Sequence, residues 1–139
     1  MASNKQSRTW LITGVSSGFG RTMTEQLLEA GETVVGTVRS TAKVVDLIKS
    51  YPETFDCRIL DVADVAAVEE VVGRAFDVHG RVDVVVSNAG YGLFGAAEEL
   101  SDDEVAKIIA TNLTGPITLI RAAIPRLREQ GGGRIIQIS

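Results

Sequence analysis

The sequence predicts an α/β fold in which a doubly wound parallel sheet lies between two layers of helices. Short runs of β-branched and apolar residues alternate with longer segments of helical periodicity, and the alternation occurs five times in 139 residues. The run VDVVV at 82–86 is almost continuously apolar, which is typical of a strand buried on both faces of a parallel sheet. With a central first strand, the expected strand order is 3-2-1-4-5, the three-layer Rossmann arrangement.

Each element has its own local signal. The strands are expected at 9–13, 33–38, 55–60, 82–86 and 134–138, and the helices at 18–30, 41–50, 65–79, 102–110 and 113–127. The last two helices are expected as separate elements, because Ser101 and Glu104 form a capping box before the fourth and Pro116 lies near the start of the fifth. His79 is expected to be exposed at the end of the third helix, before Gly80.

Composition restricts the class of protein. The length fits a single domain, 1–139, and 45% apolar with 23% charged residues is typical of a globular chain. Because Lys and Arg number 14 against 18 Asp and Glu, the net charge of −4 gives no support to nucleic-acid binding. No Cys/His cluster or carboxylate pair has the spacing of a metal site, so no metal is expected.

Cysteine usage and hydropathy indicate the compartment. Cys57 is the single cysteine, so no internal disulfide can form and a reducing, cytoplasmic location is expected. The longest uncharged stretch, 84–97, is too short and too polar to span a bilayer. The first dozen residues have neither the apolar run nor the small-residue cleavage site of a signal peptide.

The strongest chemical signal is a glycine-rich segment, TGVSSGFG at 13–20, between the first strand and the first helix. Glycines allow a tight turn and a close approach of the backbone to a pyrophosphate, which the free N–H groups of the helix N-terminus would bind. An ordinary strand-to-helix turn is the alternative. The residues expected at the cofactor are Gly14, Ser16, Ser17, Gly18, Phe19 and Gly20.

The spacing Gly-x-x-x-Gly-x-Gly resembles the short-chain dehydrogenase/reductase family, and four further motifs match it in order. They are Asp61-Val62, Ser87-Asn88-Ala89-Gly90, the segment TNLTG at 111–115 and the segment GRIIQIS at 133–139. Ser87 departs from the first Asn of the family's Asn-Asn-Ala-Gly, a small polar replacement that is expected to matter little.

The resemblance implies a role for each motif. Asp61, with Val62 beside it, would accept a hydrogen bond from the adenine amino group, or cap the following helix, or do both. Asn88 is expected to tie the fourth strand to its neighbour, whereas Ala89 and Gly90 would allow a ribose to approach. Asn112 would distort its helix and hold a water in a proton relay; a plain N-cap or helix Asn is the alternative.

The choice of dinucleotide depends on the end of the second strand. A ribose 2′-hydroxyl is usually held there by an acidic residue, while a 2′-phosphate needs a cation. The chain has no acid at this point and has Arg39, whose planar guanidinium suits a phosphate. NADP(H) is therefore predicted in preference to NAD(H), a solvated surface arginine being the alternative.

The family transfers hydride between a nicotinamide and a carbonyl or alcohol, using Ser, Tyr and Lys. The two tyrosines, Tyr51 and Tyr91, are followed four positions later by Phe55 and Gly95, so the chain has no Tyr-x-x-x-Lys. In the family's register the catalytic Ser would be the residue after Ser139. The chain is thus expected to be the cofactor-binding half of a longer oxidoreductase, inactive by itself.

Two other interpretations stay open, a free-standing NADP(H)-binding module without catalysis and an assembly in which another chain supplies Tyr and Lys. For the oxidoreductase, the expected partner is a small alcohol or carbonyl substrate. Self-association through the helix at 112–129 is also expected, because many members of the family dimerise beside it.

Overall fold

A five-stranded parallel sheet forms the centre of the computed structural model, which describes residues 5–139. Residues 1–4, which belong to the predicted domain, lie outside the described residues. The strand order is β3-β2-β1-β4-β5, as predicted. The strands are β1 (Thr9–Thr13), β2 (Thr33–Val38), β3 (Phe55–Ile59), β4 (Val84–Ser87) and β5 (Arg134–Gln137). The helices are α1 (Gly18–Glu29), α2 (Val45–Ser50), α3 (Val65–His79), α4 (Asp102–Ile109) and α5 (Gly115–Glu129), with short helical segments η1 (Thr41–Lys43), η2 (Ala97–Glu99) and η3 (Ala110–Thr114).

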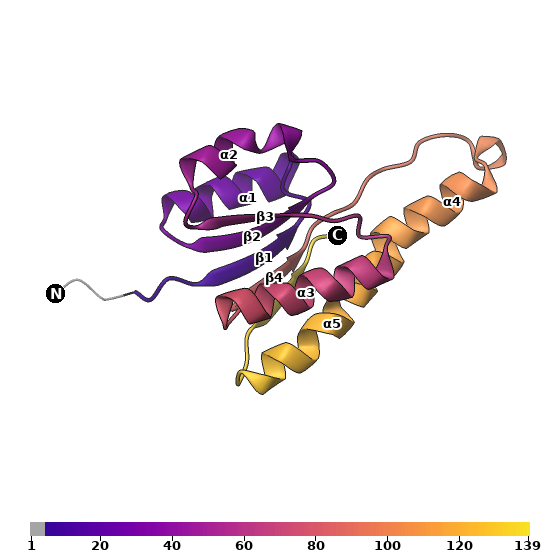
Figure 1. Ribbon diagram of the computed structural model, residues 1–139. Coiled ribbons are helices and arrows are strands. Elements are labelled where there is room, and N and C mark those ends of the chain that lie inside the picture. The colour runs from indigo at the N-terminus through magenta and orange to yellow at the C-terminus, as the bar shows by residue number, and fades with distance from the viewer. Residues whose placement is uncertain (1–4) are drawn as a thin grey trace.

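Helices cover both faces of the sheet (Figure 1). Successive side chains of a strand point to opposite faces, so each buried strand presents apolar side chains to both layers of helices. Ile12 and Val34 point to the face on which α1 and α2 pack, where Leu28 and Leu47 are buried. The neighbouring strand residues point to the opposite face, which α3 and α5 cover. There the core includes Leu11, Val35, Val72, Phe76, Leu119 and Ala123. The predicted three-layer fold is therefore present.

The fourth and fifth helices are continuous, and the prediction of two separate helices is wrong. One helix runs from Asp102 to Glu129, and the five residues of η3 within it form a π-helical turn. Ser101 does cap its start, accepting from the N–H of Glu104, whose carboxylate accepts from the N–H of Ser101. Proline cannot donate a backbone hydrogen bond, but Pro116 lies at the junction of η3 and α5, where the widened turn accommodates it.

This continuous helix, Asp102–Glu129, is the one among residues 5–139 that is long and apolar enough to cross a membrane, with a mean hydropathy of 1.2 over its best 18-residue window. The uncharged stretch at 84–97 instead forms β4, the loop after it and the first residue of η2. Core helices meet the same criterion of length and composition, and Leu119, Ala123 and Leu127 are buried in the core that α5 shares with α3. Only 22% of that window is buried, so the core contacts come from one face of α5 while much of the helix is exposed.

Two smaller expectations also need correction. His79 is not exposed: its Nε2 lies 2.9 Å from Asp56 Oδ2, and 19% of its side chain is accessible, because α3 ends over the edge strand β3. The fourth strand begins at Val84 rather than at Val82, since the ladder with β1 starts at the pair of Trp10 and Val84. Val82 is nevertheless fully buried.

Candidate cofactor site

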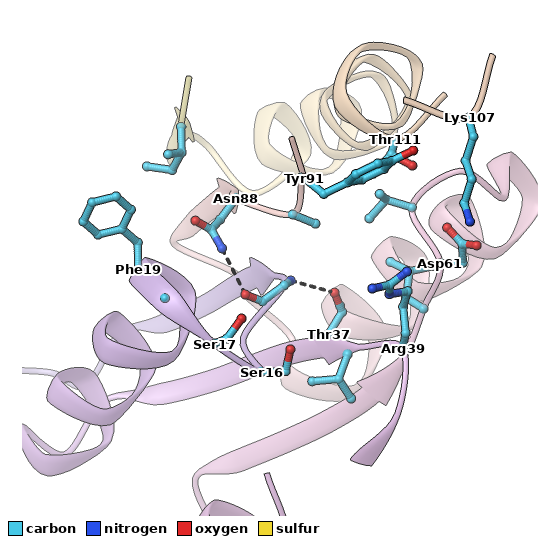
Figure 2. A pocket seen from close by; sticks show the side chains of 18 residues that line it. Ser16, Ser17, Phe19, Thr37, Arg39, Asp61, Asn88, Tyr91, Lys107 and Thr111 are labelled. Carbon is cyan, nitrogen blue, oxygen red and sulfur yellow. Dashed lines mark hydrogen bonds between the residues drawn. The ribbon is translucent and has the colours of Figure 1, made fainter. Parts of the chain in front are cut away.

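A pocket of about 420 Å³ opens at the carboxyl ends of β1, β2 and β4 and beside the loop after β3. This is the crevice in which doubly wound sheets bind ligands. Figure 2 shows side chains from all of these segments directed into it. The pocket is lined by eleven of the twelve residues predicted at the cofactor, namely Gly14, Ser16, Ser17, Gly18, Phe19, Arg39, Asp61, Val62, Asn88, Ala89 and Gly90.

The glycine-rich turn is held against β2. The N–H groups of Gly14 and Val15 both donate to the carbonyl oxygen of Thr37 at 3.0 Å, and Val15 is fully buried. Gly14 has φ +74°, and a Cβ there would lie 2.9 Å from the Cα of Ala89. Gly14 therefore allows the turn to pass directly against the loop after β4, and no other residue type fits this conformation and space.

Open space lies in front of the first turn of α1. Gly18 has φ +59°, and a Cβ added to it would meet no atom within 4 Å. Ser17 precedes it at the N-cap and uses no side-chain hydrogen bond to cap the helix, so its hydroxyl is available. The first N–H groups of a helix lack intrahelical partners and carry a partial positive charge. The open turn thus has the donors and the room that a diphosphate requires.

Gly20 is the predicted residue that does not line the pocket. It is buried behind the turn, and a Cβ on it would lie 2.1 Å from the carbonyl oxygen of Gly14 and 2.5 Å from Asn88 Nδ2. Its contribution is close packing of α1 against the turn, rather than contact with a ligand.

Asn88 joins the turn to β4, as predicted. Its Nδ2 donates to the carbonyl oxygens of Thr13, at 3.1 Å, and Gly14, at 3.0 Å. In return, the buried Thr13 hydroxyl oxygen accepts from the N–H groups of Asn88, at 3.0 Å, and Ala89, at 3.1 Å. These four hydrogen bonds fix the two loops that form the floor of the pocket.

Charged groups gather at the end of the pocket near β2 and β3. Arg39 directly follows β2, is exposed, and has no ion-pair partner among residues 5–139. Asp61 accepts from the N–H of Ala63 at 3.0 Å, and the helix cap falls instead to Asp64, which accepts from the N–H of Ala67 at 3.1 Å. The alternative in which Asp61 caps α3 is therefore wrong, and Asp61 lines the pocket.

The wall that faces this end comes from α4 and η3; the motif TNLTG at 111–115 covers most of η3, but no motif of the sequence assigns α4 to the site. Lys107 and Thr111 line the pocket there, and Figure 2 shows Lys107 directed toward Asp61 and Arg39. Their spacing of four residues, just before Asn112, is the signal that could have found them, because it places both on one face of a helix.

Asn112 lies in the π-helical turn, so the alternative of an N-cap is wrong. Its Nδ2 donates to the carbonyl oxygen of Tyr91 at 2.7 Å, and its Oδ1 accepts from the N–H of Tyr91 at 3.1 Å. A second cavity, of about 620 Å³, lies between this turn and β5 and shares Asn88, Ala89, Gly90, Tyr91 and Ile138 with the first. The cofactor pocket thus continues toward Asn112 and Ser139.

The model of the short chain dehydrogenase family matches residues 8–139. The chain belongs to this family. The chain is 39% identical over 137 residues to the oxidoreductase claN of Passalora fulva, covering 96% of this chain and 61% of that protein. It is 34% identical to a 3-ketodihydrosphingosine reductase of Bacteroides thetaiotaomicron, covering 96% of this chain and 47% of that one.

Solved structures of family members agree with the fold of this chain. A short-chain dehydrogenase from Streptomyces avermitilis superposes with a TM-score of 0.91 at 40% identity, over 96% of this chain and 49% of that one. ElxO with NADP bound superposes with a TM-score of 0.86 at 30% identity, over 96% and 56% of the two chains. The chain spans about half the length of the relatives it matches. The family is one of oxidoreductases whose Rossmann fold binds a nicotinamide cofactor.

Proposed function

We propose that this chain is the dinucleotide-binding part of an NADP(H)-dependent oxidoreductase that transfers hydride between the nicotinamide and a carbonyl or alcohol substrate. The observation that carries the proposal is the pocket itself. It combines an open glycine-rich turn at Gly18 with a cation at the end of β2, Arg39, that has no ion-pair partner within the described part of the chain. The nicotinamide, when bound, supplies or accepts the hydride.

The residues present fit the dinucleotide. The N-terminus of α1 and the Ser17 hydroxyl would hold the diphosphate, and Gly14 and Gly20 keep the backbone close enough to do so. Asp61 would accept from the adenine amino group, beside Val62. Asn88, through its hydrogen bonds to Thr13 and Gly14, forms a clamp that holds the loop after β4. Ala89 and Gly90 in this loop would lie along a ribose.

The preference for NADP(H) over NAD(H) rests on the 2′ position. No acidic residue ends β2, and Arg39 together with Ser16 would bind a 2′-phosphate. That ElxO is a relative with NADP bound supports this assignment. Titration of the chain with NADPH and NADH, followed by fluorescence or calorimetry, tests it; tighter binding of NADPH is expected, and equal affinities would reject it.

Asn112 is proposed as the catalytic residue of this half. Its side chain is hydrogen-bonded to the backbone of Tyr91, and the π-helical turn distorts the helix at this point, which supports a place for Asn112 in holding a water of the proton relay. The chain has no Tyr-x-x-x-Lys. We therefore expect the 139-residue chain to bind NADPH without oxidising or reducing alcohols and carbonyls.

A second candidate function is a non-catalytic NADP(H)-binding module, favoured by that same lack of a Tyr-x-x-x-Lys segment in the chain. Joining the chain to a segment that carries Tyr-x-x-x-Lys, or mixing it with one, separates the two. Appearance of alcohol-dependent NADP⁺ reduction supports the enzyme, and its failure to appear despite cofactor binding supports the module.

Self-association through the helix at 112–129 is part of the proposal. Leu113 and Ile117 are 56% and 46% exposed on this helix, which supports its use as a contact surface. The molar mass of the chain in solution, measured by light scattering, tests self-association, and Leu113→Asp is expected to lower that mass to the value of the monomer.

A cytoplasmic location completes the proposal. The lone Cys57 supports a reducing compartment.

A further inference from the structure

Arg21, in the first two turns of α1, makes an unusually complete set of polar contacts. Its Nε lies 2.5 Å from Glu25 Oε1. Its Nη1 donates to the carbonyl oxygen of Lys43 at 2.9 Å and to Asp46 Oδ1 at 3.2 Å, while Nη2 bonds the second carboxylate oxygen of Asp46. The side chain is 20% exposed. One guanidinium therefore connects α1 to both η1 and α2.

The segment that Arg21 holds is the one that carries Arg39. Val38, at the end of β2, is 2% exposed, and Val44, before α2, is fully buried. Between these two apolar anchors the chain leaves the sheet, and the residues from Arg39 to Lys43 are exposed or half-buried. Within the segment, Ser40 Oγ accepts from the N–H of Ala42 at 3.3 Å. At its end, the N–H of Val44 donates to the carbonyl oxygen of Thr41 at 3.0 Å, and Arg21 on α1 donates to the carbonyl oxygen of Lys43.

The two arginines have opposite situations. Arg39 lines the cofactor pocket and has no ion-pair partner among residues 5–139. Arg21 does not line the pocket, and each of its three nitrogens is already engaged. Hydrogen bonds to Asp46, and to a lesser extent to Glu25, raise the pKa of Arg21, so the guanidinium stays charged. Arg21 is thus suited to hold the loop and not to bind an anion.

We infer that Arg21 is a positioning residue for dinucleotide selectivity, which fixes the loop at 39–43 so that Arg39 faces the 2′-phosphate. The inference rests on the proposed NADP(H) function. It assigns to Arg21 an effect on the 2′-phosphate alone, because the Arg21 side chain bonds Glu25, Lys43 and Asp46 and makes no hydrogen bond to Gly18 or Ser17 at the diphosphate end.

The fork geometry of arginine is essential to this role. A guanidinium can bond the two oxygens of Asp46 and a carbonyl at the same time, whereas the compact ammonium of lysine is a point charge. Arg21→Lys therefore keeps the charge and loses the geometry, and Asp46→Asn keeps the shape and loses the partner charge. The two variants also cover the case in which Arg21→Ala fails to fold.

The experiment measures binding of adenosine 2′,5′-bisphosphate and of 5′-AMP to the 139-residue chain by calorimetry, so that the ratio of the two dissociation constants reports the 2′-phosphate. We expect Arg21→Ala and Arg21→Lys each to weaken binding of the bisphosphate by roughly 3- to 10-fold, the range of a partly exposed ion-pair network. The dissociation constant of 5′-AMP is expected to change little. Asp46→Asn is expected to have a smaller effect of the same kind.

The matched control is Arg126→Ala. Arg126 bridges α5 to Asp77 on α3, across the other face of the sheet, and lies 5.3 Å from the Phe76 ring centroid. Its loss is expected to lower the melting temperature without changing the ratio. The positioning role would be overturned if Arg126→Ala changed the ratio of the two dissociation constants as much as Arg21→Ala does. It would also be overturned if Arg21→Lys kept the wild-type ratio.

Failure of this inference can be told apart from failure of the proposed function. A wild-type chain with no preference for the bisphosphate, or an Arg39→Ala variant that keeps the preference, overturns both. A wild-type preference that Arg39→Ala removes and Arg21→Ala leaves intact overturns the role of Arg21 alone.

Discussion

Asn88 Nδ2 lies 3.0 Å from the carbonyl oxygen of Gly14, and this hydrogen bond joins the end of β4 to the glycine-rich turn after β1. The same nitrogen donates to the carbonyl oxygen of Thr13. Two segments that are 74 residues apart in the chain are held in this way at the floor of the pocket. The geometry of the proposed diphosphate site therefore depends on an amide that does not itself need to touch the ligand.

Loss of this amide should lower both stability and affinity. Asn88→Ala leaves two partly buried carbonyls without their donor, and we expect a decrease of about 1–3 kcal/mol in the free energy of unfolding. Urea denaturation followed by circular dichroism measures it. Asn88→Asp places an acceptor against the same carbonyls and should lower the free energy of unfolding more than Asn88→Ala does. A smaller decrease for Asn88→Asp would show that the hydrogen bonds donated by Asn88 do not have the role described.

A methyl group at Gly20 should disrupt the turn. A Cβ there would lie 2.1 Å from the carbonyl oxygen of Gly14, so the backbone must shift, and we expect destabilisation together with loss of NADPH binding. Gly73→Ala in α3 is the control, because its Cβ meets nothing within 4 Å. That change should instead stabilise the chain by about 0.5–1 kcal/mol through helix propensity. Equal effects of the two substitutions on thermal unfolding would contradict the packing argument.

Arg39→Ala should convert the site from NADPH toward NADH. A charge-assisted hydrogen bond contributes about 1.5–3 kcal/mol, so we expect NADPH affinity to fall by roughly 10- to 100-fold while NADH affinity stays nearly constant. Calorimetric titration measures both ligands. Arg128→Ala removes the same net charge from an exposed position on α5 and serves as the control. A parallel decrease for both dinucleotides in Arg39→Ala would count against the phosphate assignment.

The stability of the chain should fall in acid partly through Asp56. Burial by itself raises the pKa of this carboxyl group, but hydrogen bonds from Arg58 and His79 outweigh it and lower the pKa below its ordinary value of 3.8. A carboxylate whose pKa is lower in the folded state than in the unfolded state contributes stability above the unfolded pKa, and this contribution is lost as pH falls through the folded pKa.

The test compares wild type with Asp56→Asn in urea at a series of pH values. The difference in unfolding free energy between the two should be constant between about pH 5 and about pH 6 and should shrink as pH falls below about 4, where Asp56 becomes protonated. A difference that did not change over the acidic range would show that the Asp56 contacts with Arg58 and His79 do not act through its charge.

Much of this protein can be predicted from the sequence alone, because the relevant signals are local. Apolar runs and helical periodicity give the alternation of strands and helices, and the glycine spacing at 13–20 locates the turn that opens into the pocket. Arg39 could likewise be placed at the pocket from its position, since the carboxyl ends of parallel strands meet at one edge of the sheet.

Only the tertiary structure decided which groups meet across the fold. Lys107 enters the pocket wall, Gly20 packs behind the turn, and Arg21 reaches Lys43 and Asp46 on the next helical segment. The continuity of α4 with α5 was also hidden, because Ser101 and Pro116 are each compatible with a new helix start, and the π-helical turn between them has no sequence signal of its own. Such contacts depend on the separation of side chains in space, and periodicity along a chain does not record that separation.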